Sequence, residues 1–228
     1  LEALGIPAEE EEVVTSGWAA AQHLQSLPEK VGKVFVIGSK GLVEELQEGG
    51  FECVTWEEGM DEQGFLLAQQ QLDPRINVVV SGWDVNFSWA KMSLAALYLQ
   101  EGAHFVATNP DVANRVGKGL MPENGAQVAA LKAITGRDPQ VVGKPSPVLI
   151  QTLMDKFSLS KERTLMVGDR LDTDIEFGRR GGLGTALVLT GVSSRQDLQD
   201  VQHLRSMQRY PDFVLETLND LVEGGGGG

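Results

Sequence analysis

Residues 164–174 read Thr-Leu-Met-Val-Gly-Asp-Arg-Leu-Asp-Thr-Asp, a short apolar run that ends in Gly-Asp and continues into further carboxylates. The apolar run predicts a buried strand, and the acidic residues after it predict the start of a helix. In open α/β sheets ligands gather outside the carboxyl ends of the strands, which is where Asp169 would lie. Because magnesium prefers carboxylate and water oxygens, the segment indicates a site for a hard divalent cation.

The carboxylates of this segment allow two interpretations. Acidic residues in the first turn of a helix also satisfy free backbone N–H groups, and such caps are common. We therefore interpret Asp172 as a helix cap. For Asp169, the preceding glycine and the strand context favour a metal ligand.

Strand and helix patterns alternate along almost the whole chain, which predicts an α/β fold with a largely parallel sheet. The predicted strands are residues 34–37, 77–80, 104–107, 140–142, 164–167 and 185–189, and the predicted helices include residues 89–99, 128–134 and 148–157. Turn-rich stretches at 117–125 and 136–139 predict a seam between domains. The glycine run at 224–228 predicts a flexible tail.

The composition excludes several classes of protein. The 228 residues carry a formal net charge of −13, so nucleic acid and anionic membrane surfaces are poor partners. No apolar run reaches the roughly 18–20 residues that a membrane-spanning helix needs. The single cysteine, Cys53, excludes a disulfide framework and predicts a buried strand thiol in a reducing compartment.

A second segment, Gly-Lys-Pro-Ser-Pro at 143–147, directly follows a predicted strand. A lysine at the end of a strand can direct its ammonium group toward a phosphate, and the prolines favour the start of a helix. Taken alone, the segment fits a surface lysine beside a proline-initiated helix. Together with the carboxylates of 169–174, Lys144 is better explained as a phosphate-binding residue.

These two segments resemble the third and fourth motifs of the haloacid dehalogenase-like phosphatases, in the branch of the phosphoglycolate and pyridoxal phosphate phosphatases. Further similar segments are Val-Ala-Thr-Asn at 106–109, Trp-Asp-Val-Asn-Phe-Ser at 83–88 and Leu-Thr-Gly-Val-Ser at 189–193. Their order and spacing extend the resemblance over nearly the whole chain up to the glycine tail. The fold that it implies is the C-terminal half of a Rossmann-like core together with a large α/β cap domain.

The resemblance also implies a domain organisation. Residues 1–14 resemble a remnant of the N-terminal half of the core, and residues 15–137 resemble the cap that closes over the site and selects substrates. Residues 138–223 resemble the C-terminal half of the core, and residues 224–228 form the flexible tail.

Roles for individual residues follow from the same resemblance. Asp169 resembles the acid that binds Mg²⁺, and Lys144 resembles the lysine that stabilises the nucleophile and the phosphoryl oxygens. Asp174 resembles the second acid of the fourth motif, which more often supports a metal ligand than binds the metal itself. Asn109 and Arg115 bound the segment that would choose the substrate.

The chain departs from the family pattern in two places. Members of the family attack phosphorus with the first Asp of an Asp-x-Asp-Gly motif, and this sequence contains no such motif. We therefore expect the chain by itself to be inactive, and to be marginally stable or to aggregate. The second departure is Pro-Glu-Asn-Gly at 122–125, where the family has Pro-Gly-x-Gly. Glu123 adopts positive φ less readily than glycine and adds negative charge near the expected path of an anionic substrate.

Two functions are compatible with these features. The first is a Mg²⁺-dependent phosphatase of small phosphomonoesters, most like a 2-phosphoglycolate phosphatase, whose partner is a small phosphorylated metabolite. The second is a catalytically inactive structural subunit or binding protein in a larger assembly. The resemblance implies a homodimer formed through the cap. The expected location is the cytoplasm, with a plastid or another reducing intracellular compartment as the alternative.

Overall fold

The computed structural model describes residue 7 and residues 9–56 and 71–223 of the 228 residues. The chain divides into two compact units, Leu1–Gly143 and Lys144–Gly228. No helix among the described residues has the length and apolar character that crossing a membrane requires. The whole predicted tail, residues 224–228, lies outside the described residues. So do residues 1–6 and 8 of the predicted N-terminal remnant.

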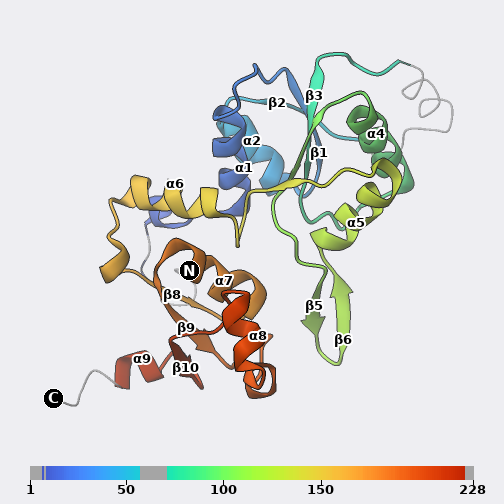
Figure 1. Cartoon of the computed structure of the whole chain (residues 1–228). Helices are drawn as coiled ribbons and strands as arrows, with labels where there is room; N and C mark the ends of the chain where they lie inside the picture. The colour runs from blue at the N-terminus through green and yellow to red at the C-terminus, as the bar shows by residue number, and fades with distance from the viewer. Residues whose placement is uncertain (1–6, 8, 57–70, 224–228) are drawn as a thin grey trace. The chain divides into compact units, whose positions relative to one another are not determined.

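The first unit is built on a parallel five-stranded sheet with the strand order β2-β1-β3-β4-β7 (Figure 1). Its strands are β1 (Lys33–Ile37), β2 (Glu52–Val54), β3 (Ile76–Ser81), β4 (His104–Ala107) and β7 (Gln140–Val141). Residues 34–37 of β1 are all buried, as expected for a strand of a parallel sheet that is covered on both faces. The predicted α/β fold with a parallel sheet is thereby confirmed.

Helices cover both faces of this sheet, with α1 packed on α2 and α4 packed on α5 (Figure 1). They are α1 (Ser16–Gln25), α2 (Lys40–Glu48), α4 (Trp89–Gln100) and α5 (Asn124–Thr135). A short 3₁₀ turn, Glu10–Glu12, precedes α1. Phe35 and Ile37 pack with Leu94, Leu99 and Leu131 in a cluster that joins β1 to α4 and α5.

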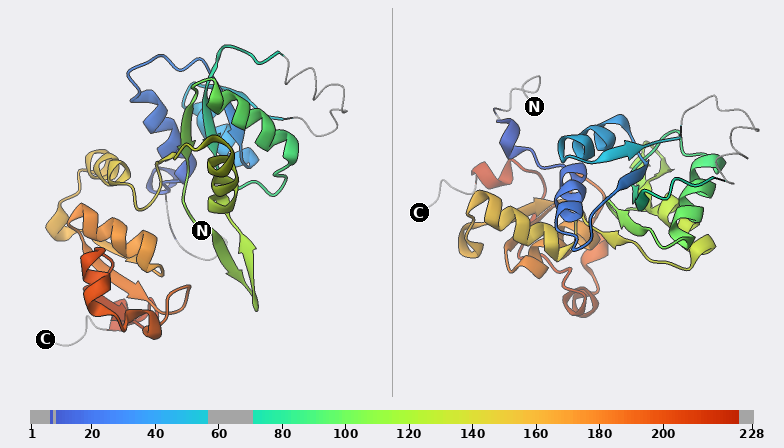
Figure 2. Two further views of the ribbon diagram at one scale, coloured as in Figure 1. Left: turned by 45° about the vertical axis from the view of Figure 1, so that its right-hand side comes forward. Right: turned by 90° about the horizontal axis from the view of Figure 1, so that it is seen from above.

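An antiparallel hairpin leaves the first unit between β4 and α5. It consists of β5 (Ala113–Val116) and β6 (Gly119–Pro122), and Figure 2 shows it extending away from the five-stranded sheet. Every residue of β6 is exposed to solvent. The strand β6 therefore presents its side chains to solvent.

The second unit has a parallel three-stranded sheet with the order β10-β9-β8. The strands are β8 (Leu165–Gly168), β9 (Gly184–Val188) and β10 (Phe213–Leu215), and the α-helices are α6 (Pro147–Phe157), α7 (Glu176–Gly181), α8 (Val201–Ser206) and α9 (Asp220–Glu223). Shorter turns are the 3₁₀ segments η3 (Lys161–Arg163) and η5 (Arg195–Leu198) and the π-helical segment η4 (Leu171–Ile175). Leu171, Ile175, Leu187 and Leu204 form the core cluster against the sheet.

The predicted division after residue 137 would place the strand 140–142 in the sheet of the second unit, but the strand belongs to the sheet of the first unit. In the structure β7 hydrogen-bonds to β4, with Val106 opposite Gln140 and Ala107 opposite Val141. The two compact units accordingly divide between Gly143 and Lys144, several residues after the predicted division. The assignment of the two units as a cap and half of a core remains a prediction.

Candidate active site

The candidate active site is built at the carboxyl end of β8. The strand ends at Gly168, and the chain then forms the wide π-helical turn η4 instead of the ordinary helical turn that the sequence predicts. The N–H groups of Asp174 and Ile175 both donate to the carbonyl of Arg170, at 3.1 and 3.0 Å. Single π turns of this kind recur at functional sites, because they re-aim one side chain within a helix.

The turn brings the carboxylate of Asp174 back beneath the end of the strand. Its Oδ2 accepts hydrogen bonds from the N–H groups of Asp169 and Arg170, both at 3.1 Å. Gly168 permits this arrangement, since a Cβ atom at that position would collide with the side chain of Asp174. Asp174 is 4% exposed and therefore holds the backbone of the site in place from the inside.

Lys144 completes this arrangement from the start of the second unit. Its Nζ lies 2.6 Å from Oδ1 of Asp174, in an ion pair whose carboxylate side chain is 6% exposed and whose lysine side chain is 46% exposed. Both oxygens of Asp174 are thus engaged. The Lys144–Pro145 peptide bond is cis. The ammonium group is anchored by a buried charge on one side and open to solvent on the other, where it can meet an anion.

Asp169 is oriented by the loop after β9. Val192 donates its N–H to Oδ2 of Asp169 at 2.7 Å, and Ser193 donates its N–H to the Asp169 carbonyl at 3.0 Å. The hydroxyl of Ser193 in turn accepts the N–H of Leu171 at 3.2 Å. A Cβ atom on Gly191 would overlap the Asp169 carboxylate, so a glycine is needed for this close approach.

This loop is a functional element to which the sequence interpretation assigns no role. The stretch 189–193 is part of the family resemblance, but nothing in its composition says which residue it contacts. The available signal is topological: β9 neighbours β8 in the sheet, and the carboxyl ends of parallel neighbours meet at one edge.

The carboxylate of Asp169 at the end of β8 fits a magnesium ion whose remaining ligands are water and substrate phosphate. Among the described hydrogen bonds, none reaches Oδ1 of Asp169, so this oxygen is free to bind a cation. Within the part of the chain that the structure describes, no group of three His, Cys, Asp and Glu side chains is placed to hold a metal ion. Magnesium is commonly bound by one or two carboxylates together with waters and substrate phosphate, which is the situation that Asp169 offers.

Asp172 does not act as the helix cap that the sequence predicts. Its two carboxylate oxygens accept hydrogen bonds from Nε and Nη2 of Arg170, at 3.2 and 3.1 Å. The N-cap position of η4 is Arg170, which makes no side-chain capping bond. Because the turn is π-helical, the backbone N–H groups near its start are taken by Asp174 instead.

Of the predicted site residues, the structure brings Lys144, Asp169 and Asp174 together in the second unit, whereas Asn109 and Arg115 belong to the first. Asn109 follows β4, where its Oδ1 accepts the N–H of Asp111 at 3.1 Å and its carbonyl accepts Nδ2 of Asn124 at 2.8 Å. The backbone of Arg115 lies in β5 opposite Leu120, and its side chain lies outside the described atoms. Their substrate-binding role remains a prediction.

Glu123, which stands where the family has glycine in Pro-Gly-x-Gly, causes no strain in the backbone at 122–125. Glu123 has φ −117°, an extended value open to any residue, and its Oε1 accepts Nδ2 of Asn114 at 2.8 Å. The expected conflict with positive φ is therefore wrong. The glycine that the fold needs is Gly125, because a Cβ atom there would collide with the carbonyls of Pro110 and Asp111.

Comparison with known proteins gives consistent matches in sequence and in structure. Residues 141–221 match the HAD-hydrolase-like family, and residues 1–52 match the haloacid dehalogenase-like hydrolases. The chain is 38% identical to the chloroplastic phosphoglycolate phosphatase 1A of Arabidopsis thaliana over 230 aligned positions, covering 97% of this chain and 62% of that protein. It is 38% identical to chronophin of Rattus norvegicus, covering 95% of this chain and 68% of chronophin.

Solved structures agree with these relatives. A p-nitrophenyl phosphatase from Archaeoglobus fulgidus superimposes with a TM-score of 0.78 at 32% identity, covering 98% of this chain and 78% of the other. A glycerol phosphate phosphatase from Mycobacterium tuberculosis in complex with magnesium superimposes with a TM-score of 0.81 at 34% identity, covering 97% and 61%. The chain thus spans about three fifths to three quarters of the lengths of these proteins.

Proposed function

The chain belongs to the haloacid dehalogenase-like hydrolases, and from this premise we propose that its protein is a magnesium-dependent phosphatase of small phosphomonoesters. The observation that supports this most directly is the Lys144–Asp174 ion pair of 2.6 Å at the carboxyl end of β8, beside Asp169. We propose 2-phosphoglycolate as the first substrate to test, because relatives at 38% identity carry that name.

Each residue of the site has a separate task in this proposal. Asp169 would hold the magnesium ion through Oδ1, since its other oxygen is held by the N–H of Val192. Asp174 fixes the ammonium group of Lys144, which would bind the oxygens of the transferring phosphoryl group. When bound, magnesium supplies positive charge that stabilises the phosphoryl group as its charge redistributes.

The nucleophile is the part of the reaction that these residues do not supply. The 228 residues contain no Asp-x-Asp-Gly, and the only Asp-x-Asp, at 172–174, is occupied by contacts to Arg170 and Lys144. We therefore expect these residues by themselves to bind magnesium and orthophosphate without turning over a phosphomonoester. Steady release of p-nitrophenol by the 228-residue chain with magnesium would contradict this expectation.

The experiment that tests the proposed activity uses the natural protein with 2-phosphoglycolate, glycerol phosphate and pyridoxal phosphate, with and without magnesium. Lys144→Ala and Asp169→Asn should each lower kcat/KM by about 10²-fold or more, as the loss of a group that stabilises transition-state charge does. Lys161→Ala is the matched control, because Lys161 is an exposed lysine of the same unit. Unchanged kcat/KM in Lys144→Ala would overturn the assignment.

The second candidate function is a catalytically inactive binding subunit, and it applies if the natural protein contains no Asp-x-Asp-Gly at all. In that case the natural protein binds magnesium and phosphate at Lys144 and Asp169 but hydrolyses none of the three esters. We further propose a homodimer through the first unit and a reducing compartment, either cytoplasm or plastid. Light scattering of the natural protein measures whether it is a dimer. Microscopy of a tagged protein shows its compartment.

A further inference from the structure

The first unit has a pocket of its own at the switch point of its sheet. From β1 the chain runs outward to β2 and then returns to the other side of β1 to form β3, β4 and β7. In open α/β sheets the crevice at such a reversal, outside the carboxyl ends of the strands, is where ligands bind. The structure has a pocket of about 260 Å³ at this place, and its lining includes none of Lys144, Asp169 and Asp174.

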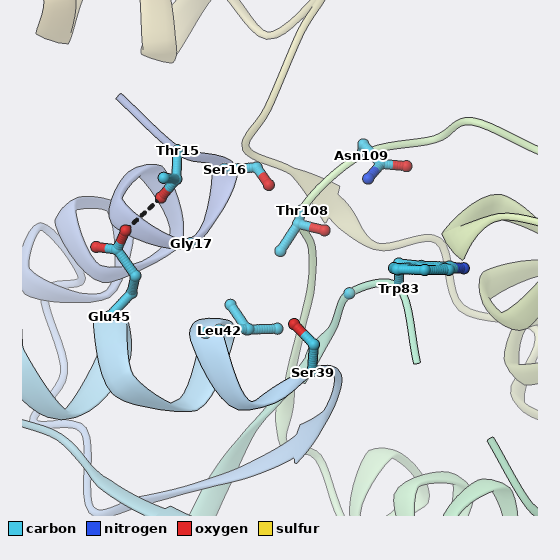
Figure 3. A pocket seen from close by; sticks show the side chains of 11 residues that line it. Thr15, Ser16, Gly17, Ser39, Leu42, Glu45, Trp83, Thr108 and Asn109 are labelled. Atoms are coloured by element: carbon cyan, nitrogen blue, oxygen red, sulfur yellow. Dashed lines mark hydrogen bonds between the residues drawn. The ribbon is translucent and has the colours of Figure 1, made fainter. Parts of the chain in front are cut away.

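The pocket is lined by segments that follow three neighbouring strands and precede two helices. Ser39 and Gly41 follow β1, Gly82 and Trp83 follow β3, and Thr108 and Asn109 follow β4, while Thr15, Ser16 and Gly17 begin α1 (Figure 3). The pocket volume suits a small ion or acid better than a drug-sized molecule, whose sites run from roughly 300 to 1,000 Å³.

Two helix N-termini meet at this pocket. The ten-residue α1 begins at Ser16 and the nine-residue α2 begins at Lys40. The first N–H groups of a helix have no partner within it, and they carry partial positive charge that attracts anions. Thr15 caps α1 by accepting the N–H of Trp18, whereas Ser39 makes no side-chain capping bond to α2.

A buried hydroxyl independently indicates a ligand. Thr108 is 3% exposed, and no described residue forms a hydrogen bond with its Oγ1. Figure 3 shows its side chain in the pocket, between Ser39 and Asn109. Gly82 leaves the hydroxyl uncovered, because a Cβ atom at Gly82 would lie 3.3 Å from Oγ1 of Thr108. The hydroxyl faces the pocket, so a bound oxyanion could accept its hydrogen.

The charges around the pocket limit how strongly it can attract an anion. Among the described residues that line the pocket there is no lysine or arginine, and Glu45 is the only one with a charged side chain. Oε1 of Glu45 accepts the hydroxyl of Thr15 at 2.6 Å, and Figure 3 shows this pair away from Trp83, on the other side of Leu42. Binding would therefore depend on neutral donors, with Glu45 weakening the attraction.

We propose that this pocket binds a small oxyanion, a carboxylate or a phosphate, through the hydroxyls of Ser39 and Thr108 and the first N–H groups of α1 and α2. The inference concerns the first unit alone and does not depend on phosphatase activity at Lys144. A carboxylic acid such as glycolate and free orthophosphate share the required chemistry. They are distinguished by titrating each one separately.

The test is calorimetric titration of the natural protein with orthophosphate, sulfate and glycolate in EDTA, together with tryptophan fluorescence. Trp83 is 41% exposed and lines the pocket, so bound anion should change its emission, and Trp83→Phe should remove the change. The same titrations in Lys144→Ala separate this site from the one in the second unit. Binding that disappears in Lys144→Ala but persists in the pocket variants would overturn the inference.

Gly41→Asp is the decisive variant. A Cβ atom at Gly41 meets nothing within 4 Å, so the new side chain fits, and a carboxylate in the first turn of α2 should stabilise the helix. Anion affinity should fall at least tenfold while Tm is unchanged or higher. Gly41→Asn, of equal size and without charge, is the matched control and should bind more tightly than Gly41→Asp. Equal affinities in the two variants would contradict the proposal.

Two further variants test the contact with the Thr108 hydroxyl and the sign of the ligand charge. Thr108→Val keeps the buried volume and removes the hydroxyl, and it should weaken binding. Glu45→Gln keeps an acceptor for Thr15 and removes the only negative charge in the pocket, so it should tighten the binding of an anion. Weaker binding in Glu45→Gln would show that the ligand is not an anion, and the inference would fail.

Discussion

At the scale of single residues, the orientation of Asp169 depends on a glycine in another segment. The Cβ atom of an alanine at 191 would overlap the Asp169 carboxylate and push it away from the N–H of Val192. We expect Gly191→Ala to lower magnesium affinity about 10- to 100-fold, the usual effect of disturbing groups that orient a metal ligand. Calorimetric titration with magnesium in the presence of orthophosphate measures this.

Gly119→Ala is the control for that experiment. The nearest atom to a Cβ at Gly119 is the carbonyl oxygen of Val116 at 3.9 Å, which is an ordinary contact. Magnesium affinity should therefore be unchanged in this variant. If the two alanine variants bind magnesium equally well, the loop 189–193 does not orient Asp169.

Loss of Asp174 should lower the stability of the fold more than loss of its partner Lys144. Asp174→Asn removes the ion pair and weakens two backbone hydrogen bonds to a buried carboxylate, which should cost about 2–4 kcal/mol of stability. Lys144→Met removes a half-exposed ammonium and leaves those two bonds, so it should cost about 1 kcal/mol or less. Chemical denaturation of both variants decides; equal losses would contradict this account.

Cys53 should be a slow nucleophile. Burial raises the pKa of its thiol from 9.0 to about 11, because the thiolate is poorly solvated there. At pH 7.5 the thiolate fraction, and with it the rate of iodoacetamide alkylation, should be about 100-fold below that of an unperturbed thiol. The neutral thiol stabilises the fold fully below pH 9, and this contribution is lost as the pH rises through about 11. Alkylation at the rate of a free cysteine would contradict the prediction.

At the scale of elements, arginines of α7 and of the segment between α8 and β10 hold the second unit together. Arg179 donates to the Tyr210 carbonyl at 2.7 Å and pairs with Asp212 at 2.8 Å. Arg180 pairs with Glu176, one helical turn earlier. The element α7 is therefore fixed to the chain that leads into β10.

Glu176 is the centre of this connection. It is 2% exposed, and its second oxygen accepts Nε of Arg209 at 2.6 Å. Glu176→Gln should destabilise the unit by about 2–4 kcal/mol, because two arginines lose a buried partner. Thermal unfolding of Glu176→Gln, Arg209→Met and the double variant measures the coupling. If the two single losses simply add in the double variant, the pair contributes no coupling energy.

At the scale of the whole molecule, the three-stranded sheet has an open edge. Among the described strands β8 pairs only with β9, and Leu165 at its start is 41% exposed. Unpaired edges with apolar side chains favour association with another chain. We expect the 228-residue chain to elute above its monomer mass of 24.6 kDa in size-exclusion chromatography with light scattering.

Leu165→Lys should reduce that association, because a charged side chain opposes edge pairing. Leu159→Lys is the control, since Leu159 is 40% exposed and precedes the strand. A monodisperse monomer of the unmodified chain would contradict the prediction, as would equal association of the two lysine variants.

The sequence by itself determined the class of fold, and it predicted Lys144, Asp169 and Asp174 as site residues. Alternating β-branched runs and helical patterns predicted parallel α/β units, and the motifs that contain Lys144, Asp169 and Asp174 carried the resemblance to the family. These properties are local, because strand and turn preferences and side-chain chemistry are set by neighbouring residues. The structure brings the same three residues together at the end of β8.

Only the tertiary structure decided which segments meet. The local sequence of the short strand 140–141 does not show which sheet the strand joins. Its hydrogen bonds to β4 assign it to the first unit. Likewise, the contact of Val192 with Asp169 and the position of Thr108 between two helix N-termini arise from strand order. Strand order depends on pairing between distant segments, which no local pattern encodes, and so both sites gained residues that the sequence could not assign.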